Sequence, residues 1–209
     1  MDFELWLAFV AASTALLLIP GPTVLLVLSY ALSKGPSVAV ASATGVALGD
    51  LIAMTASLLG LGALVLASAT LFSVLKWVGA AYLVWLGIKL LRSAPSSGMQ
   101  AVATGRDVTA RGVFGHAAAV TALNPKSIAF FIAFVPQFLR PAEPLGPQFA
   151  ILIATFVGLA GLNALAYALL ADRLRRVIGR PGIITGMTRF GGLTLIGMGV
   201  ATAVLRRPA

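Results

Sequence analysis

The stretch LWLAFVAASTALLLIPGPTVLLVLSY, from Leu5 to Tyr30, is apolar almost throughout and is interrupted by Pro20-Gly21-Pro22. A bilayer core roughly 30 Å thick needs about 20 apolar residues in a helix, so this stretch can cross it. Because proline has no N–H, the carbonyls of Leu16 and Leu18 lose their usual helical partners. Such backbone is tolerated at membrane depth only where it is buried in protein or lines a wet cavity. We therefore predict a membrane helix that is broken about two thirds of the way across.

The composition extends this interpretation to the whole chain. Of its 209 residues, 59% are hydrophobic and 10% are charged, and the mean hydropathy is +1.01. Soluble domains contain about a quarter charged residues, so this balance is typical of an integral membrane protein. We predict an all-α protein with a single membrane domain and six transmembrane helices, at Leu5–Tyr30, Val38–Leu66, Leu71–Leu91, Gly112–Leu139, Phe149–Leu170 and Ile183–Leu205.

The first of these segments is expected to be a true helix rather than a signal peptide. A signal peptide begins with positive charges, whereas this chain begins with Asp2 and Glu4 and no Lys or Arg. The absence of cysteine excludes thiol redox chemistry and disfavours a metal carrier that depends on thiolates. We expect no cofactor and no bound metal.

The net charge of +9 does not indicate a nucleic-acid partner, because the basic residues stand at the ends of apolar runs. The first, third and fifth loops, with their flanks, hold most of them: Lys34, Lys89, Arg92, Arg106, Arg111, Arg173, Arg175, Arg176, Arg180 and Arg189. The opposite side holds only Arg140, Arg206 and Arg207. Since cytoplasmic loops carry an excess of Lys and Arg, we predict that both termini are extracytoplasmic and that the loop Ser93–Arg111 is cytoplasmic.

The two halves of the chain share several spacings. The spacing of Gly45 and Asp50 in the second segment recurs as that of Gly158 and Asn163 in the fifth. The spacing of Gly79, Leu83 and Gly87 in the third segment recurs as that of Gly191, Leu195 and Gly199 in the sixth. Because each half has three segments, the second half enters the membrane from the opposite side. We predict two inverted repeats, residues 1–92 and 112–209, joined by the cytoplasmic loop 93–111.

The fourth segment is interrupted like the first, by Asn124-Pro125-Lys126, and here the carbonyl of Thr121 loses its partner. Two such breaks, entering from opposite faces, would meet near the middle of the bilayer. A lone proline would more simply be a kink. A broken helix, however, offers a positive N-terminal end to a carboxylate and a negative C-terminal end to an ammonium group, which are the two charges of a free amino acid.

Asp50 lies well inside the second segment, where an ionised carboxylate costs at least roughly 2.5–3.5 kcal/mol. We therefore expect it to face the protein interior. It could be protonated and hydrogen-bonded to a neighbouring helix in a purely structural role. It could equally pair with a lysine, receive the ammonium of a substrate, or change its protonation state during a transport cycle. The sequence does not choose among these roles.

Three further polar residues lie within the predicted spans. Lys76 either extends its side chain to the outer headgroups or contributes to the interior. Lys126 lies deeper and is expected to be a countercharge, either to Asp50 or to a substrate carboxylate. Asn163 is an uncharged candidate for the lining. The predicted substrate and transport residues are thus Pro20, Gly21, Pro22, Asp50, Lys76, Thr121, Asn124, Pro125, Lys126 and Asn163.

Five stretches together carry a resemblance to a known family: Pro20-Gly21-Pro22 with Thr23; Gly45 through Asp50; Lys76-Trp77-Val78-Gly79-Ala80-Ala81-Tyr82-Leu83 with Gly87 and Lys89; Asn124-Pro125-Lys126 with Phe130-Phe131; and Phe134-Val135-Pro136-Gln137-Phe138. On these residues the sequence resembles the lysine exporter family of bacterial amino-acid efflux proteins, the LysE/RhtB group, over nearly its whole length. It looks more like the branch associated with homoserine, homoserine lactone and threonine than like the basic amino-acid branch.

The resemblance implies a six-helix inner-membrane secondary transporter that exports an amino acid or a derivative, driven by the proton or ion gradient. The expected partners are this substrate and membrane lipid, and a homo-oligomer is compatible with the sequence. Two other classes of function fit the sequence less well. An intramembrane enzyme is disfavoured because the chain has no His-Glu-x-x-His motif and Asp50 has no second intramembrane acid. A non-transporting scaffold would leave the paired breaks and Asp50 unexplained.

Overall fold

The computed structural model describes residues 2–19, 21–34, 38–67, 69–92, 109–140, 143–171, 173 and 181–204. In these residues the regular structure is helical, as the sequence predicts. The main elements are α1 (Phe3–Leu18), α2 (Pro22–Lys34), α3 (Ala39–Ala67), α4 (Ala69–Arg92), α5 (Ala110–Ala122), α6 (Pro125–Ala133), the 3₁₀ helix η2 (Val135–Phe138), α7 (Leu145–Leu169) and α9 (Pro181–Val204).

Two helices in the described part of the chain are long and apolar enough to cross a membrane alone, α3 over Ala39–Ala63 and α7 over its full length. Two broken pairs reach this length only together: α1 with α2, bent by 57°, and α5 with α6 and η2, bent by 45°. The described residues therefore provide two spans, or up to four if each bent pair is one span. α4 and α9 coincide with the third and sixth predicted segments, and the arrangement of six spans stays a prediction.

Proline chemistry accounts for where each broken helix restarts. After α1 the chain leaves helical geometry at Ile19, with φ −72° and ψ 116°. Pro22 is then the first residue of α2, a position where its missing N–H has no intrahelical partner to lose. At the second break Asn124 caps α6: its side-chain oxygen accepts the N–H of Lys126 at 3.1 Å, and Pro125 begins the helix. Pro20 lies outside the described residues.

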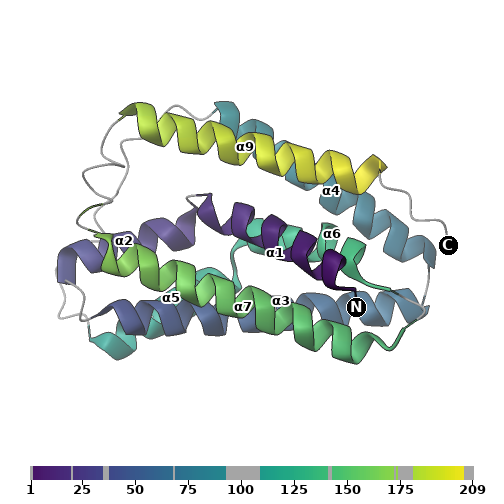
Figure 1. Cartoon of the computed structure of the whole chain (residues 1–209), viewed down its shortest axis with the longest axis horizontal. Coiled ribbons are helices and arrows are strands. Elements are labelled where there is room, and N and C mark those ends of the chain that lie inside the picture. Colours follow the sequence, from purple (N-terminus) through teal and green to yellow (C-terminus); the bar gives the residue numbers. More distant parts are fainter. Residues whose placement is uncertain are drawn as a thin grey trace.

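Glycines bring two pairs of helices into backbone contact. α3 packs on α5, and a Cβ added at Gly45 or Gly49 would come within 2.5 Å of the Phe114 carbonyl oxygen or 2.6 Å of the Ala118 carbonyl oxygen. α4 packs on α9, and the two lie side by side along one edge of the molecule (Figure 1). There a Cβ at Gly199 would lie 2.7 Å from the carbonyl oxygen of Ala80. Helices in membranes associate through such small residues, because lipid supplies no hydrophobic driving force between them.

Aromatic side chains fix α6 against α7. Phe130, Phe131 and Phe156 are fully buried, and the rings of Phe131 and Phe156 meet edge to face with centroids 4.8 Å apart. Offset and edge-to-face pairs of this kind add to the gain from burial alone. Along its length α6 packs mainly on α3 and α4. These contacts, together with the ring of Phe156, set the position of α6 and hence of Lys126 in its first turn.

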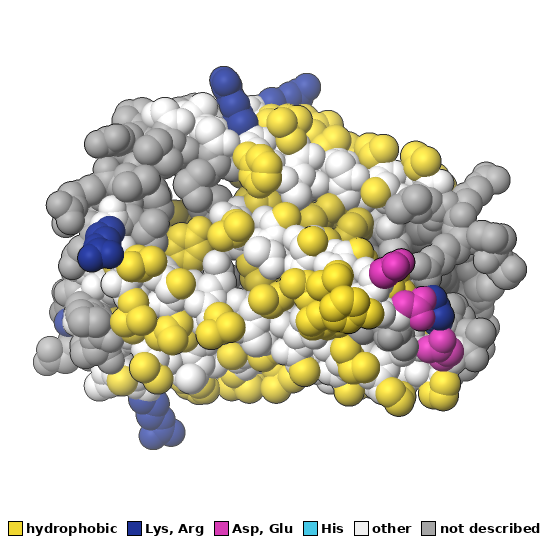
Figure 2. All heavy atoms as spheres, in the orientation of Figure 1, with side chains coloured by type: hydrophobic (Ala, Val, Ile, Leu, Met, Phe, Trp, Pro, Cys, Tyr) yellow, Lys and Arg dark blue, Asp and Glu magenta, His cyan; other side chains and the backbone are white. Residues whose placement is uncertain are grey.

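Charge is divided between the two ends of the molecule. The N-terminal end of α1 and the C-terminal end of α9 lie at the same end (Figure 1). Acidic side chains gather there beside one basic residue, while apolar side chains cover the middle (Figure 2). Described basic residues mark the other end: Lys34 at the end of α2, Arg92 at the end of α4, Arg111 at the start of α5 and Arg173 after α7.

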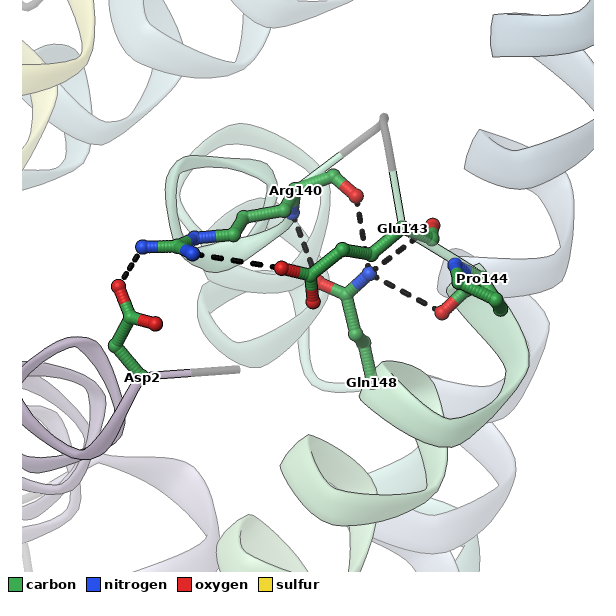
Figure 3. A network of polar contacts seen from close by, with 5 residues as sticks. All are labelled: Asp2, Arg140, Glu143, Pro144 and Gln148. Atoms are coloured by element: carbon green, nitrogen blue, oxygen red, sulfur yellow. Dashed lines mark hydrogen bonds and ion pairs between the residues drawn. The ribbon is translucent and has the colours of Figure 1, made fainter.

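A polar network ties the start of α1 to the loop before α7 (Figure 3). The Arg140 guanidinium pairs with Asp2 and, at 3.4 Å, with Glu143. The buried Gln148 side chain accepts the N–H of Arg140 at 2.8 Å and donates to the carbonyls of Arg140, Glu143 and Pro144. Asp2 is the N-cap residue of α1, yet its carboxylate makes no capping bond to its own helix. It contacts Arg140 instead.

Candidate functional site

A small cavity lies where the two breaks meet. Its volume is about 30 Å³, which is room for about two water molecules. Apolar side chains of α1, α2, α3 and α7 form much of its wall, and the polar side chains and the glycine that line it are Gly21, Thr23, Asp50, Asn124, Lys126, Ser127, Asn163 and Tyr167.

Side chains of α6 and α7 bind the carbonyls at the C-terminal end of α1. The Lys126 ammonium donates to the carbonyl oxygens of Leu16 at 3.2 Å and Ile19 at 3.1 Å. On α7, Asn163 donates to the carbonyl of Leu17 at 3.2 Å, and the Tyr167 hydroxyl donates to that of Leu18 at 3.4 Å. Three side chains thus supply donors to four successive carbonyls. The negative end of a helix dipole favours a cation, so the ammonium of Lys126 is well placed.

A second set of bonds joins the two breaks directly. The Asn124 side-chain amide donates to the Thr23 hydroxyl at 3.2 Å, and the hydroxyls of Thr23 and Thr121 lie 3.4 Å apart. Gly21 is in contact with the other break: a Cβ added there would lie 3.2 Å from Nζ of Lys126. A side chain at position 21 would therefore compete for space with the ammonium.

Asp50 on α3 faces the same cavity, and one of its two carboxylate oxygens has no hydrogen-bond partner in the part of the chain that the structure describes. Its side chain is 2% exposed, and its Oδ1 atom is buried with no hydrogen bond. Its charge interacts with that of Lys126, but the two form no ion pair of 4.0 Å or less in the described part of the chain. A buried acceptor without a partner costs free energy, so its presence at the cavity calls for an explanation.

The structure brings together half of the predicted site residues: Gly21, Asp50, Asn124, Lys126 and Asn163 line the cavity. Thr121 is buried behind the wall, bonded to Thr23. Pro22 and Pro125 are exposed and do not line the cavity. A proline that starts a helix acts through its backbone, so the part of Pro22 and Pro125 in transport stays a prediction. Pro20 and the side chain of Lys76 lie outside the described residues.

Three polar lining residues were not among the predicted ones, namely Thr23, Ser127 and Tyr167. A signal for Tyr167 is present in the sequence, because it follows Asn163 by four residues and so shares its helix face. The described residues contain no group of three His, Cys, Asp or Glu side chains that could hold a metal ion. The cavity instead offers one carboxylate, one ammonium and the ends of two broken helices. These groups are complementary to a small molecule that carries both charges.

The sequence pattern of the LysE type translocator family matches residues 14–206. A "Homoserine/homoserine lactone efflux protein" of Salmonella typhimurium is 36% identical over 97% of this chain and 98% of its own length. An "Uncharacterized membrane protein" of Vibrio cholerae is 34% identical over 99% of this chain and all of its own length. A "Leucine efflux protein" of Enterobacter sp. is 32% identical over 70% of each chain. No solved structure matches this chain.

Proposed function

Since this chain belongs to the LysE type translocator family, we propose that it is a secondary transporter that exports an amino acid or amino-acid derivative across the bacterial inner membrane. Transport proceeds by alternating access and is coupled to the proton or ion gradient. The observation that carries this proposal is the meeting of two broken helices at a cavity that contains an ammonium group and a carboxylate, one oxygen of which has no hydrogen-bond partner among the described residues.

The charges of the cavity favour a substrate with no net charge. Asp50 and Lys126 balance one another, so a zwitterion leaves the balance intact. A second positive charge, as on lysine, would enter without a matching carboxylate, which is costly in a water-poor site. The names of two relatives agree with this class in part: homoserine and leucine both have uncharged side chains, whereas homoserine lactone, which the first name also gives, has no free carboxylate. Homoserine-like and threonine-like compounds are therefore the first candidates.

The dimensions of the cavity require movement of its walls. An amino acid of ten or so heavy atoms does not fit in about 30 Å³. The two breaks are natural places for this movement, since a helix without continuous backbone bonds bends at little cost. Two inverted repeats would give the breaks equivalent roles facing opposite sides of the membrane. α1 with α2, α3 and α4 would form the first repeat, and α5 with α6, α7 and α9 the second.

The uneven distribution of charged residues supports the proposed orientation of the protein in the membrane. The end that carries Lys34, Arg92 and Arg111 is the one proposed to face the cytoplasm. The end with Asp2 and Glu143 then faces outward, and both termini are extracytoplasmic.

Everted membrane vesicles test this function, because an exporter loads them from the medium. Vesicles that contain the wild-type chain are expected to accumulate labelled homoserine, threonine or leucine more than lysine, and ionophores that collapse both the proton and the sodium gradient should abolish the accumulation. Asp50→Asn is expected to insert normally and to lose most of the transport. Lys89→Gln is the matched control, because Lys89 lies over the Trp85 ring on α4, away from the cavity. If well-folded wild-type chain accumulates none of these compounds, the proposal is wrong.

A further inference from the structure

We infer that Lys126 is a resident competitor of the substrate: its ammonium occupies the subsite for the substrate's own ammonium at the C-terminal end of α1, and each transport cycle exchanges one for the other. This inference rests on the proposed function. It places the Lys126 ammonium at the α1 carbonyls when the site is empty and at Asp50 when the substrate is bound.

The chemistry of the subsite is that of an ammonium site. Two carbonyl oxygens, of Leu16 and Ile19, accept hydrogen bonds from Lys126 Nζ at 3.2 and 3.1 Å. A lysine side chain ends in the group R–NH₃⁺, which is also the charged group at the α-carbon of an amino acid. Carbonyls at the end of a broken membrane helix bind cations through their own charge and through the helix dipole. Nothing in this geometry distinguishes the two ammonium groups.

The subsite holds only one ammonium at a time. The neighbouring carbonyls of Leu17 and Leu18 already accept bonds from Asn163 and Tyr167. On the open side, the position that a Cβ would take at Gly21 lies 3.2 Å from Nζ, so the glycine hydrogens leave no room for a second group there. Two ammonium groups on the same pair of carbonyls would also repel each other strongly. Substrate and Lys126 therefore exclude each other.

Asp50 provides the place to which Lys126 withdraws. Its Oδ1 atom is buried and without a partner, it lines the same cavity, and its charge already interacts with that of Lys126. A flexible four-carbon side chain can swing from the carbonyls to this carboxylate as the substrate ammonium arrives. The unsatisfied oxygen then gains its partner in the loaded state. The net charge of the cavity is unchanged, because the incoming molecule is a zwitterion.

This arrangement favours export. When the site opens outward, the tethered ammonium returns to the α1 carbonyls and displaces the substrate, which lowers the affinity on the side of release. The alternative is that Lys126 binds the substrate's carboxylate. The two models predict different effects of removing the lysine. Loss of a competitor strengthens the binding of an amine by freeing the carbonyls and does not selectively abolish the binding of an acid. Loss of a carboxylate subsite selectively abolishes the binding of an acid, and an amine then gains only from the removal of a nearby positive charge.

The test measures binding of two fragments of homoserine to full-length protein in lipid nanodiscs by calorimetry. 3-Amino-1-propanol carries the ammonium without the carboxylate, and 4-hydroxybutyrate carries the carboxylate without the ammonium. Lys126→Met is expected to bind the amine about tenfold more tightly than the wild type, since it removes a competitor held by two charge-assisted bonds. Lys126→Arg keeps a positive competitor and is expected to bind the amine as weakly as the wild type.

Two further variants keep the result interpretable. Lys89→Met loses a lysine outside the cavity and should leave the binding of both fragments unchanged. Asp50→Asn removes the negative charge that attracts the displaced ammonium and should weaken amine binding even if Lys126→Met folds poorly. Unchanged or weaker amine binding by well-folded Lys126→Met overturns the inference, and selective loss of acid binding would establish the carboxylate model instead. Because the fragments report on the subsite alone, a failure of vesicle transport remains a separate result.

Discussion

A double-mutant cycle on Asp50 and Lys126 measures how strongly the two charges of the cavity depend on each other. The perturbations are Asp50→Asn, Lys126→Met and the two together. Two unit charges 4 Å apart attract by about 4 kcal/mol at an effective dielectric constant near 20. The pair is not within 4.0 Å, so this value is an upper limit. Exposed pairs give at most about 1 kcal/mol. We therefore expect a coupling free energy between about 1 and 4 kcal/mol.

The single variants are expected to be less stable than the wild type for different reasons. Asp50→Asn leaves the ammonium of Lys126 without its countercharge. Lys126→Met leaves the Asp50 carboxylate alone, removes the donor of the Ile19 carbonyl and leaves the Leu16 carbonyl with the N–H of Ile19 only. The double variant removes both charges, so its loss of stability should be smaller than the sum of the two single losses.

Reversible unfolding in mixed micelles, followed by circular dichroism, supplies the free energies for the cycle. Asp50→Asn combined with Lys89→Met is the matched control, and these two changes should be additive within about 0.5 kcal/mol because the residues share no partner. A coupling below that limit for Asp50 with Lys126 would show that the cavity does not hold the two charges as a balanced pair. The cavity would then have no preference for a substrate without net charge.

Three further outcomes follow from particular contacts. Gly49→Leu should lower the free energy of unfolding by about 1–3 kcal/mol or more and reduce the amount of protein in the membrane, since its side chain meets the Ala118 carbonyl oxygen. Gly60→Leu on the same helix has open space and should be tolerated. Equal amounts of both variants would refute close α3–α5 packing. Ser13 on α1 is fully buried. Asp2→Asn and Arg140→Gln should each raise the labelling of Ser13→Cys by an impermeant thiol reagent from outside, by up to about fivefold, the most that an exposed ion pair supplies. Because the natural chain lacks cysteine, no other thiol reacts, and no change would mean that this pair does not stabilise the packing of α1. A reporter that is active only outside the cytoplasm should work when fused after α9 and fail when inserted in the loop 93–111; the reverse pattern would invert the proposed orientation.

The positions of the helix breaks could be predicted from the sequence because proline acts locally. A missing N–H at Pro22 or Pro125 ends a helical bond pattern whatever surrounds it, and the structure restarts a helix at both residues. The donors that satisfy the freed carbonyls could not be predicted. That Lys126 binds the carbonyls of Leu16 and Ile19 depends on how α6 packs against α3 and α4, which the sequence does not reveal.

The environment of Asp50 could likewise be predicted only in part from the sequence. The cost of a charge in the membrane indicated that it faces the interior, and the structure places it at the cavity. Whether it has a partner depends on distances of an ångström or two between helices, and no pattern in the sequence fixes these. Its part in transport remains a prediction.

The bonds at the end of α1 also constrain the order of events while the protein is made. Leu16 and Lys126 are 110 residues apart in the chain. At about 5–20 residues per second, the ribosome synthesises the lysine roughly 5–20 s after the leucine. Asn163 and Tyr167, which bind the next two carbonyls, come later still. The nascent α1 and α2 must therefore wait beside water, the insertion machinery or a chaperone until the second half arrives. Truncated chains that stop before α6 should accordingly be recognised and degraded as unfinished.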